Sequence, residues 1–189
     1  MNAKLVDVSR PLALLVYVAA SSACAADKDG QTQVAVQALC RASTLEPDLD
    51  ALALTGPGVN PDTGELDLPS GTSYVVSSTY GVPKPGEDGA GVSARYLTLF
   101  DGVSKQLAKQ PGLVAMQLSS SETCGSGRTL AIWASEEMMY DFVTSQAHLA
   151  AMSAAPEILQ PGYAVTHWTA TSADQATFVE AVRHLGEQD

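Results

Sequence analysis

Strand and helix patterns that alternate between residues 72 and 186 predict an α+β fold with an antiparallel sheet. Residues 74–80 and 113–120 are rich in the Tyr, Val, Ser and Thr or apolar residues that strands favour. Residues 93–110 carry apolar side chains at helical spacing, namely Tyr96, Phe100, Val103 and Leu107. The predicted order is strand, helix, strand, strand, helix, strand and a terminal helix, which is the ferredoxin-like split βαβ arrangement with an N-terminal extension.

Turn and cap residues separate these elements. The Gly- and Pro-rich residues 81–91 form a loop after the first strand, and Pro111-Gly112 ends the first helix. A hairpin-like connection over residues 119–128 leads into the third strand, residues 129–133.

The second half of the fold begins at Ser135, which caps a helix whose first turn contains Glu136 and Glu137. A short helix follows over residues 147–155 and is expected to stop at Pro156. The fourth strand covers residues 162–169. The terminal helix is predicted to start from a Ser172/Gln175 capping box and to end near Leu185-Gly186.

Side-chain parity indicates that both faces of the sheet need burial. Residues 113–120 and 129–133 present apolar residues on both faces, whereas a sheet covered on one side only has a polar outer face. The helices are expected on one face. We therefore predict that a second copy of the chain covers the other, giving a homodimer.

The N-terminal 71 residues divide into two parts. Lys4 and Arg10, the apolar residues 11–20 and Ala23-Cys24-Ala25 predict a signal peptide over residues 1–25, and hence an exported protein of the periplasm, envelope or extracellular space. A lipid anchor at Cys24 and an uncleaved segment are the alternatives. Residues 26–71 are an extension with a short helix around residues 33–42 and a Gly/Pro-rich linker over residues 55–71.

Charge and cysteine content limit the classes of partner. A net charge of -11 with scattered basic residues excludes a nucleic-acid partner, and the apolar run is too short to span a membrane. After export, Cys40 and Cys124 either pair or remain isolated thiols. Neither is expected to be a catalytic thiol, because no histidine is near in sequence.

Three stretches carry a family resemblance: QPGLVAMQL (residues 110–118), LAIWASEEMMYDFVTSQAH (residues 130–148), and the closing strand with Val165 and His167-Trp168. With them, the sequence from about residue 72 to residue 169 resembles the antibiotic biosynthesis monooxygenase (ABM)-like domains of the dimeric α+β barrel superfamily, over about half the chain, and residues 72–189 are predicted to form this domain. The resemblance implies a homodimer and a ligand pocket between sheet and helices. Several members are oxidoreductases that oxidise polycyclic aromatic substrates with O2 and without a cofactor.

The sequence departs from the haem-degrading branch of this family at three positions. Its pattern places an Asn on the first strand, a Trp where this chain has Phe142, and a His where this chain has Met152. We therefore expect no haem, and no other cofactor.

Two histidines and six further side chains are candidate site residues. His148 and His167 are candidate catalytic bases because imidazole titrates near neutral pH. The alternatives are a helix-capping His148 and a hydrogen-bonded sheet histidine. The candidate substrate-binding residues supply aromatic or adaptable apolar contact, with core packing as the alternative: Tyr80, Trp133, Tyr140, Phe142, Met152 and Trp168. No spacing predicts a metal site.

Two functions follow from these observations. In the first, the protein is an exported, cofactor-independent monooxygenase acting on an aromatic or polyketide-like small molecule, with His148 as base. In the second, it is a non-catalytic ligand-binding or dimer-scaffold domain.

Overall fold

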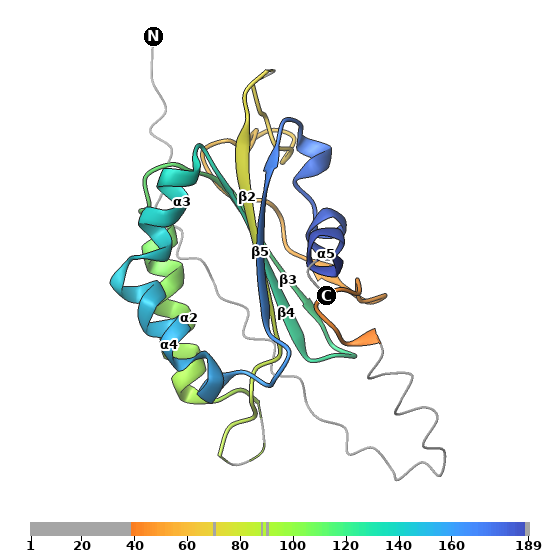
Figure 1. Ribbon diagram of the computed structural model, residues 1–189, viewed down its shortest axis with the longest axis vertical. Coiled ribbons are helices and arrows are strands. Elements are labelled where there is room, and N and C mark those ends of the chain that lie inside the picture. The colour runs from red at the N-terminus through yellow and green to blue at the C-terminus, as the bar shows by residue number, and fades with distance from the viewer. Residues whose placement is uncertain (1–38, 70, 88, 90, 188–189) are drawn as a thin grey trace.

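The computed structural model describes residues 39–69, 71–87, 89 and 91–187, and these form one antiparallel sheet with helices on both sides (Figure 1). The predicted signal peptide and Cys24 lie outside the described residues. The sheet has the order β1-β3-β4-β2-β5. The elements are β1 (Asp50–Ala51), β2 (Tyr74–Gly81), α2 (Ala94–Leu107), β3 (Leu113–Ser121), β4 (Ser126–Trp133), α3 (Glu136–Val143), α4 (Gln146–Ile158), β5 (Ala164–Ala170), the 3-10 turn η1 (Ala173–Gln175) and α5 (Phe178–Gly186).

The α+β fold and its split βαβ order are confirmed. The hydroxyl of Ser93 accepts a hydrogen bond from the Tyr96 amide at the start of α2, and the Ser135 hydroxyl accepts one from the Met138 amide at the start of α3. The chain turns after α2 at Gly112, where φ is 79°. Among the described residues, no helix is long and apolar enough to cross a membrane.

Two helix boundaries differ from the prediction. Pro156 lies inside α4 and does not stop it, because the Leu159 amide still bonds to the Ala155 carbonyl and Ile158 is buried. The terminal helix begins after Thr177, whose hydroxyl accepts a hydrogen bond from the Glu180 amide at 3.2 Å. Ser172 makes no such bond and precedes the short turn η1.

The strand β4 is also longer than predicted. It begins at Ser126, and the register pairs Ser121 with Ser126 and Ser119 with Arg128. Residues 126–128, which the sequence assigned to the hairpin connection, therefore belong to β4. This extension places Arg128 on the same face as Leu130 and Ile132.

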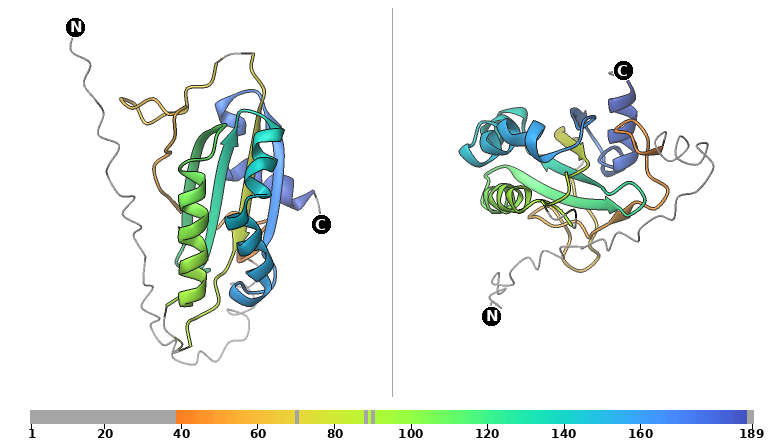
Figure 2. Two further views of the ribbon diagram at one scale, coloured as in Figure 1. Left: turned by 90° about the vertical axis from the view of Figure 1, so that its left-hand side faces the viewer. Right: turned by 90° about the horizontal axis from the view of Figure 1, so that it is seen from below.

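The two faces of the sheet are covered by different parts of the chain. Helices α2, α3 and α4 lie on one side, and α5 lies on the other (Figures 1 and 2). The α5 side holds a core that the partly buried Leu49, Leu54, Val59, Leu66, Leu68 and Val114 extend. Its buried members are Tyr74, Val76, Ala115, Leu130, Ile132, Trp168, Ala170, Ala176, Phe178 and Ala181.

The face of the sheet away from helices α2, α3 and α4 is thus buried by the chain itself. The parity of the strands is as predicted, but α5 and the residues before β2 occupy the face assigned above to a second copy. The homodimer stays a prediction, and it requires another surface.

Residues 40–68, which we call the N-terminal arm, lie against the sheet, and residues 55–68, predicted as part of a Gly/Pro-rich linker, pack on it. The arm follows the edge of β3: the amides of Leu52, Thr55 and Gly58 donate to carbonyls of that strand at 2.8–3.0 Å. Gly56 adopts a φ of 140°, and a Cβ there would lie 2.6 Å from the Val114 carbonyl oxygen. Glycine is required at this close approach.

A buried ion pair fixes the arm to the β3–β4 hairpin. The Arg128 Nε donates to Glu46 Oε2 at 2.8 Å, and both side chains are 0% exposed. The remaining guanidinium nitrogens donate to the carbonyl oxygens of Arg41, Ala42 and Thr44. The Ser126 hydroxyl donates to the other Glu46 oxygen at 2.6 Å.

Two further contacts support this attachment. Cys40 and Cys124 form a disulfide, so the paired alternative is the one found. Asp48 accepts hydrogen bonds from the Ser121 hydroxyl and the Thr123 amide, and these bonds lower the pKa of its carboxyl to about 2.

We predict that Glu46→Ala lowers the free energy of unfolding by about 3–5 kcal/mol, because it leaves the Arg128 guanidinium buried without a counter-ion. Urea denaturation followed by circular dichroism measures the change. The double variant E46L/R128M removes both charges and should lose less than Glu46→Ala. A loss below 1 kcal/mol in Glu46→Ala would contradict a structural role for the pair.

We also predict that Gly56→Ala destabilises the protein by about 2 kcal/mol or more, since it adds a steric clash to an unfavourable backbone conformation. The matched control is Gly64→Ala, where φ is also positive but no atom lies within 4 Å of the added Cβ. Thermal unfolding should rank the proteins wild type, Gly64→Ala, Gly56→Ala. Equal losses in the two variants would show that the close approach to Val114 is unimportant.

Candidate functional site

The helix side of the sheet is the less completely covered of its two faces. Along β2, Tyr74, Val76, Ser78 and Tyr80 point toward α5 and are buried, while the alternating residues that face the helices are only part-buried. On β5 the contrast is larger, because Val165 and His167 face the helix side and are exposed. Solvent therefore reaches the space between β5 and the helix layer.

An aromatic stack forms the inner wall of this side. The rings of Trp133 and Phe142 lie 5.2 Å apart, and the imidazole of His148 lies 4.7 Å from Phe142. The Trp133 indole donates to the Ser77 hydroxyl at 2.9 Å. Trp133 is fully buried and Phe142 nearly so, which is the core-packing role given as the alternative for both.

His148 lies in the first turn of α4 and is half-buried. Its Nδ1 lies 3.0 Å from the Val143 carbonyl oxygen, so Nδ1 carries a proton and donates it there. Burial lowers the pKa of the imidazole, and the bond to Val143 opposes this in part. The neutral tautomer leaves the Nε2 lone pair as the proton acceptor.

His167 and Tyr140 meet at the outer rim of the same side. Their rings contact edge to face with centroids 6.4 Å apart, and Tyr140 is 47% exposed. Met152 on α4 is 51% exposed. These three side chains have the solvent access that the stacked Trp133 and Phe142 lack.

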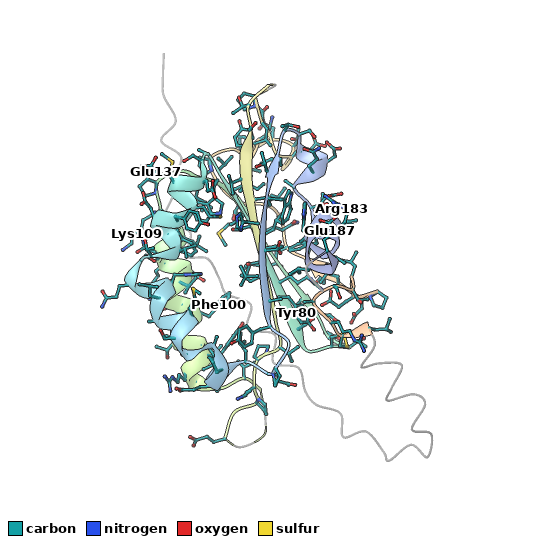
Figure 3. All side chains as sticks on the ribbon, in the orientation of Figure 1. Tyr80, Phe100, Lys109, Glu137, Arg183 and Glu187 are labelled. Atoms are coloured by element: carbon teal, nitrogen blue, oxygen red, sulfur yellow. A yellow bond between two sulfur atoms is a disulfide. The ribbon has the colours of Figure 1, made fainter. Side chains whose placement is uncertain are left out.

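Tyr80 and Trp168, two of the candidate substrate-binding residues, lie on the other face of the sheet from this group. Tyr80 lies on the α5 side, on the opposite face of the sheet from Phe100 of α2 (Figure 3), and its ring packs 4.6 Å from the Arg128 guanidinium. Trp168 stacks on His184 of α5 at 4.9 Å and donates to the Gln175 carbonyl at 2.8 Å.

Arg128 and Glu46 are the residues that sequence reasoning missed. The alternation of side chains along β4 could have revealed Arg128. Once β4 is extended to Ser126, this arginine falls on the buried face beside Leu130. A buried guanidinium requires a carboxylate partner. Glu46, 82 residues earlier, supplies it.

Two cavities lie away from the predicted site residues. One of about 210 Å³ is lined by Leu52, Ala53, Thr55, Met116 and Leu118. The other, of about 530 Å³, lies between the N-terminal arm and the start of α5 and is lined by Leu54, Gly64, Glu65, Leu66, Gln117, Ala173, Ala176, Thr177 and Phe178. Within the described part of the chain, no three His, Cys, Asp or Glu residues are grouped to hold a metal ion.

No protein-family model and no curated protein matches the chain. Several solved structures are similar to it. Rv0793 from Mycobacterium tuberculosis is 18% identical with a TM-score of 0.43, over 50% of this chain and 92% of its own. NE2512 from Nitrosomonas europaea is 14% identical with a TM-score of 0.43, over 54% and 93%. SnoaB, a cofactor-independent oxygenase from Streptomyces nogalater, is 15% identical with a TM-score of 0.39, over 53% and 93%.

These likenesses concern the fold. At identities of 18% or less and TM-scores of 0.43 or less, they show no family for this chain. The activity in the name of the Streptomyces protein is a property of that protein.

We predict that His148 makes the stability of the protein depend on pH. Because the folded-state pKa of His148 lies below the ordinary histidine pKa of about 6.5, the unfolded chain binds the proton first, and the free energy of unfolding falls as the pH drops below about 6.5. Denaturation between pH 5 and 8 should show this slope in wild type. His148→Gln should flatten it, while the exposed control His167→Gln should keep it; an unchanged slope in His148→Gln would contradict the assignment.

Proposed function

We propose that the protein is an exported domain of the monooxygenase-like α+β fold that binds an aromatic small molecule on the helix side of its sheet. The observation that carries this proposal is the solvent-accessible contact between Tyr140 and His167, beside a sheet face whose own residues are only part-buried. Met152 of α4 is exposed as well. Exposed rings and a flexible thioether provide large contact area for a flat apolar ligand.

Binding is favoured over catalysis by the state of the two histidines. The Nδ1–H of His148 donates a hydrogen bond to the Val143 carbonyl, and the ring packs on Phe142, as in a helix-capping residue. His167 is exposed, and a base open to bulk water lacks the water exclusion that strengthens electrostatic effects in an active site. Both histidines are therefore better placed to contact a bound ligand than to take a proton from it.

Cofactor-independent oxygenation is the second candidate function, and one observation favours it. The bond from Nδ1 to Val143 fixes the neutral tautomer of His148, so Nε2 is available to take a proton from a phenolic substrate. The lowered pKa keeps this nitrogen unprotonated near neutral pH.

Export is supported by the disulfide. A Cys40–Cys124 bond persists in oxidising compartments, which is consistent with the signal peptide predicted over residues 1–25. A homodimer remains part of the proposal, with its interface away from the α5 side of the sheet, since that side is filled by the chain itself.

We predict that an anthrone-type aromatic ligand binds the mature protein, and that Tyr140→Ala and His167→Ala each weaken binding about tenfold by removing ring contacts. Isothermal titration calorimetry measures the affinity. The control is Val179→Ala, an exposed apolar residue of α5 on the opposite side of the sheet. Equal losses in all three variants, or no binding by wild type, would refute the site.

Oxygen consumption with the same ligand separates binding from catalysis. We expect wild type to bind without consuming O2. Consumption that is lost in His148→Ala and kept in Val179→Ala would replace the binding proposal with the oxygenase. Equal consumption by wild type and His148→Ala would remove His148 from any mechanism.

A further inference from the structure

The N-terminal arm has one covalent link to the sheet that it covers. Cys40, at the start of the arm, is joined to Cys124 in the turn between β3 and β4, 84 residues away. Both cysteines are only part-buried, so a small thiol in solution can reach the bond. The other attachments of the arm are non-covalent.

The arm shields the apolar α5 side of the sheet. Leu54, Leu66 and Leu68 pack against the core that contains Val76 and Ile132, both 0% exposed. The fit is incomplete, because the cavity of about 530 Å³ separates the arm from the start of α5. A layer with fewer packed contacts and edge-strand hydrogen bonds is the kind that opens locally while the rest of a fold persists.

The disulfide restricts how far such an opening can go. With the bond intact, an arm that leaves β3 is still tied at Cys40 and again where β2 begins at Tyr74, so it remains a closed loop. Without the bond, the Cys40 end is held by non-covalent contacts alone, chiefly the Glu46–Arg128 pair and the Asp48 hydrogen bonds, and an opening that breaks them gains the conformational freedom that loop closure removes. Reduction therefore shifts the balance between the closed and open arm.

We propose that the Cys40–Cys124 disulfide is a redox-sensitive switch that controls whether the N-terminal arm stays closed over the α5 side of the sheet. In the switching step a dithiol transfers two electrons and two protons to the disulfide. The S–S bond becomes two thiols, and the dithiol becomes a cyclic disulfide. The oxidised protein keeps its sheet covered, and the reduced protein exposes apolar side chains of that face.

Hydrogen–deuterium exchange of the full chain, with and without dithiothreitol, tests the proposal. We expect reduction to increase exchange at the amides of Leu52, Thr55 and Gly58 at least tenfold, because these bond to carbonyls of β3. Amides of β2 and β4 should keep their protection. Binding of an apolar fluorescent dye should rise in parallel.

The control is the double variant C40S/C124S, whose arm should exchange rapidly at either redox state. Unchanged arm exchange on reduction of wild type would overturn the switch. Loss of protection in β2 and β4 together with the arm would overturn it as well, since the bond would then stabilise the whole fold and not one segment. Preserved circular dichroism with fast arm exchange supports it.

Discussion

The buried pair of Arg128 and Glu46 is the interaction on which the arrangement of this protein depends. A guanidinium with no solvent exposure on a central strand is tolerable only when its charge and its N–H groups have partners. Glu46 and three carbonyls of the arm provide them, and Ser126 donates to the other oxygen of Glu46. The arm is therefore a required part of the fold.

The position of the arm determines which face of the sheet stays accessible to solvent. Its leucines and α5 fill one side with apolar contacts, so that side needs no second chain for burial. The helices cover the other side only in part, and the exposed rings of Tyr140 and His167 lie there. The candidate binding site and the closed face are thus two results of the same packing.

The differences between prediction and structure have identifiable physical causes. Pro156 removes one amide donor, but α4 continues because buried Ile158 and the loop hydrogen bonds from Lys84 and Gln160 fix its end. The Gly/Pro-rich stretch after residue 55 resembles a linker, yet Gly56 and Gly58 are needed for close contact with Val114. Tyr80 and Trp133 are both aromatic strand residues, and only the register places them on opposite faces.

The sequence by itself determined the order of elements, the caps at Ser93 and Ser135 and the parity of the strands, because these depend on contacts within a few residues. It also supplied the helix-side candidates His148, Tyr140 and Phe142, which share one segment. The tertiary structure decided the pairing of Glu46 with Arg128, the choice between disulfide and free thiols, and the cover of the α5 side. The ion pair and the disulfide join residues 82 and 84 positions apart, and no local pattern encodes such a distance.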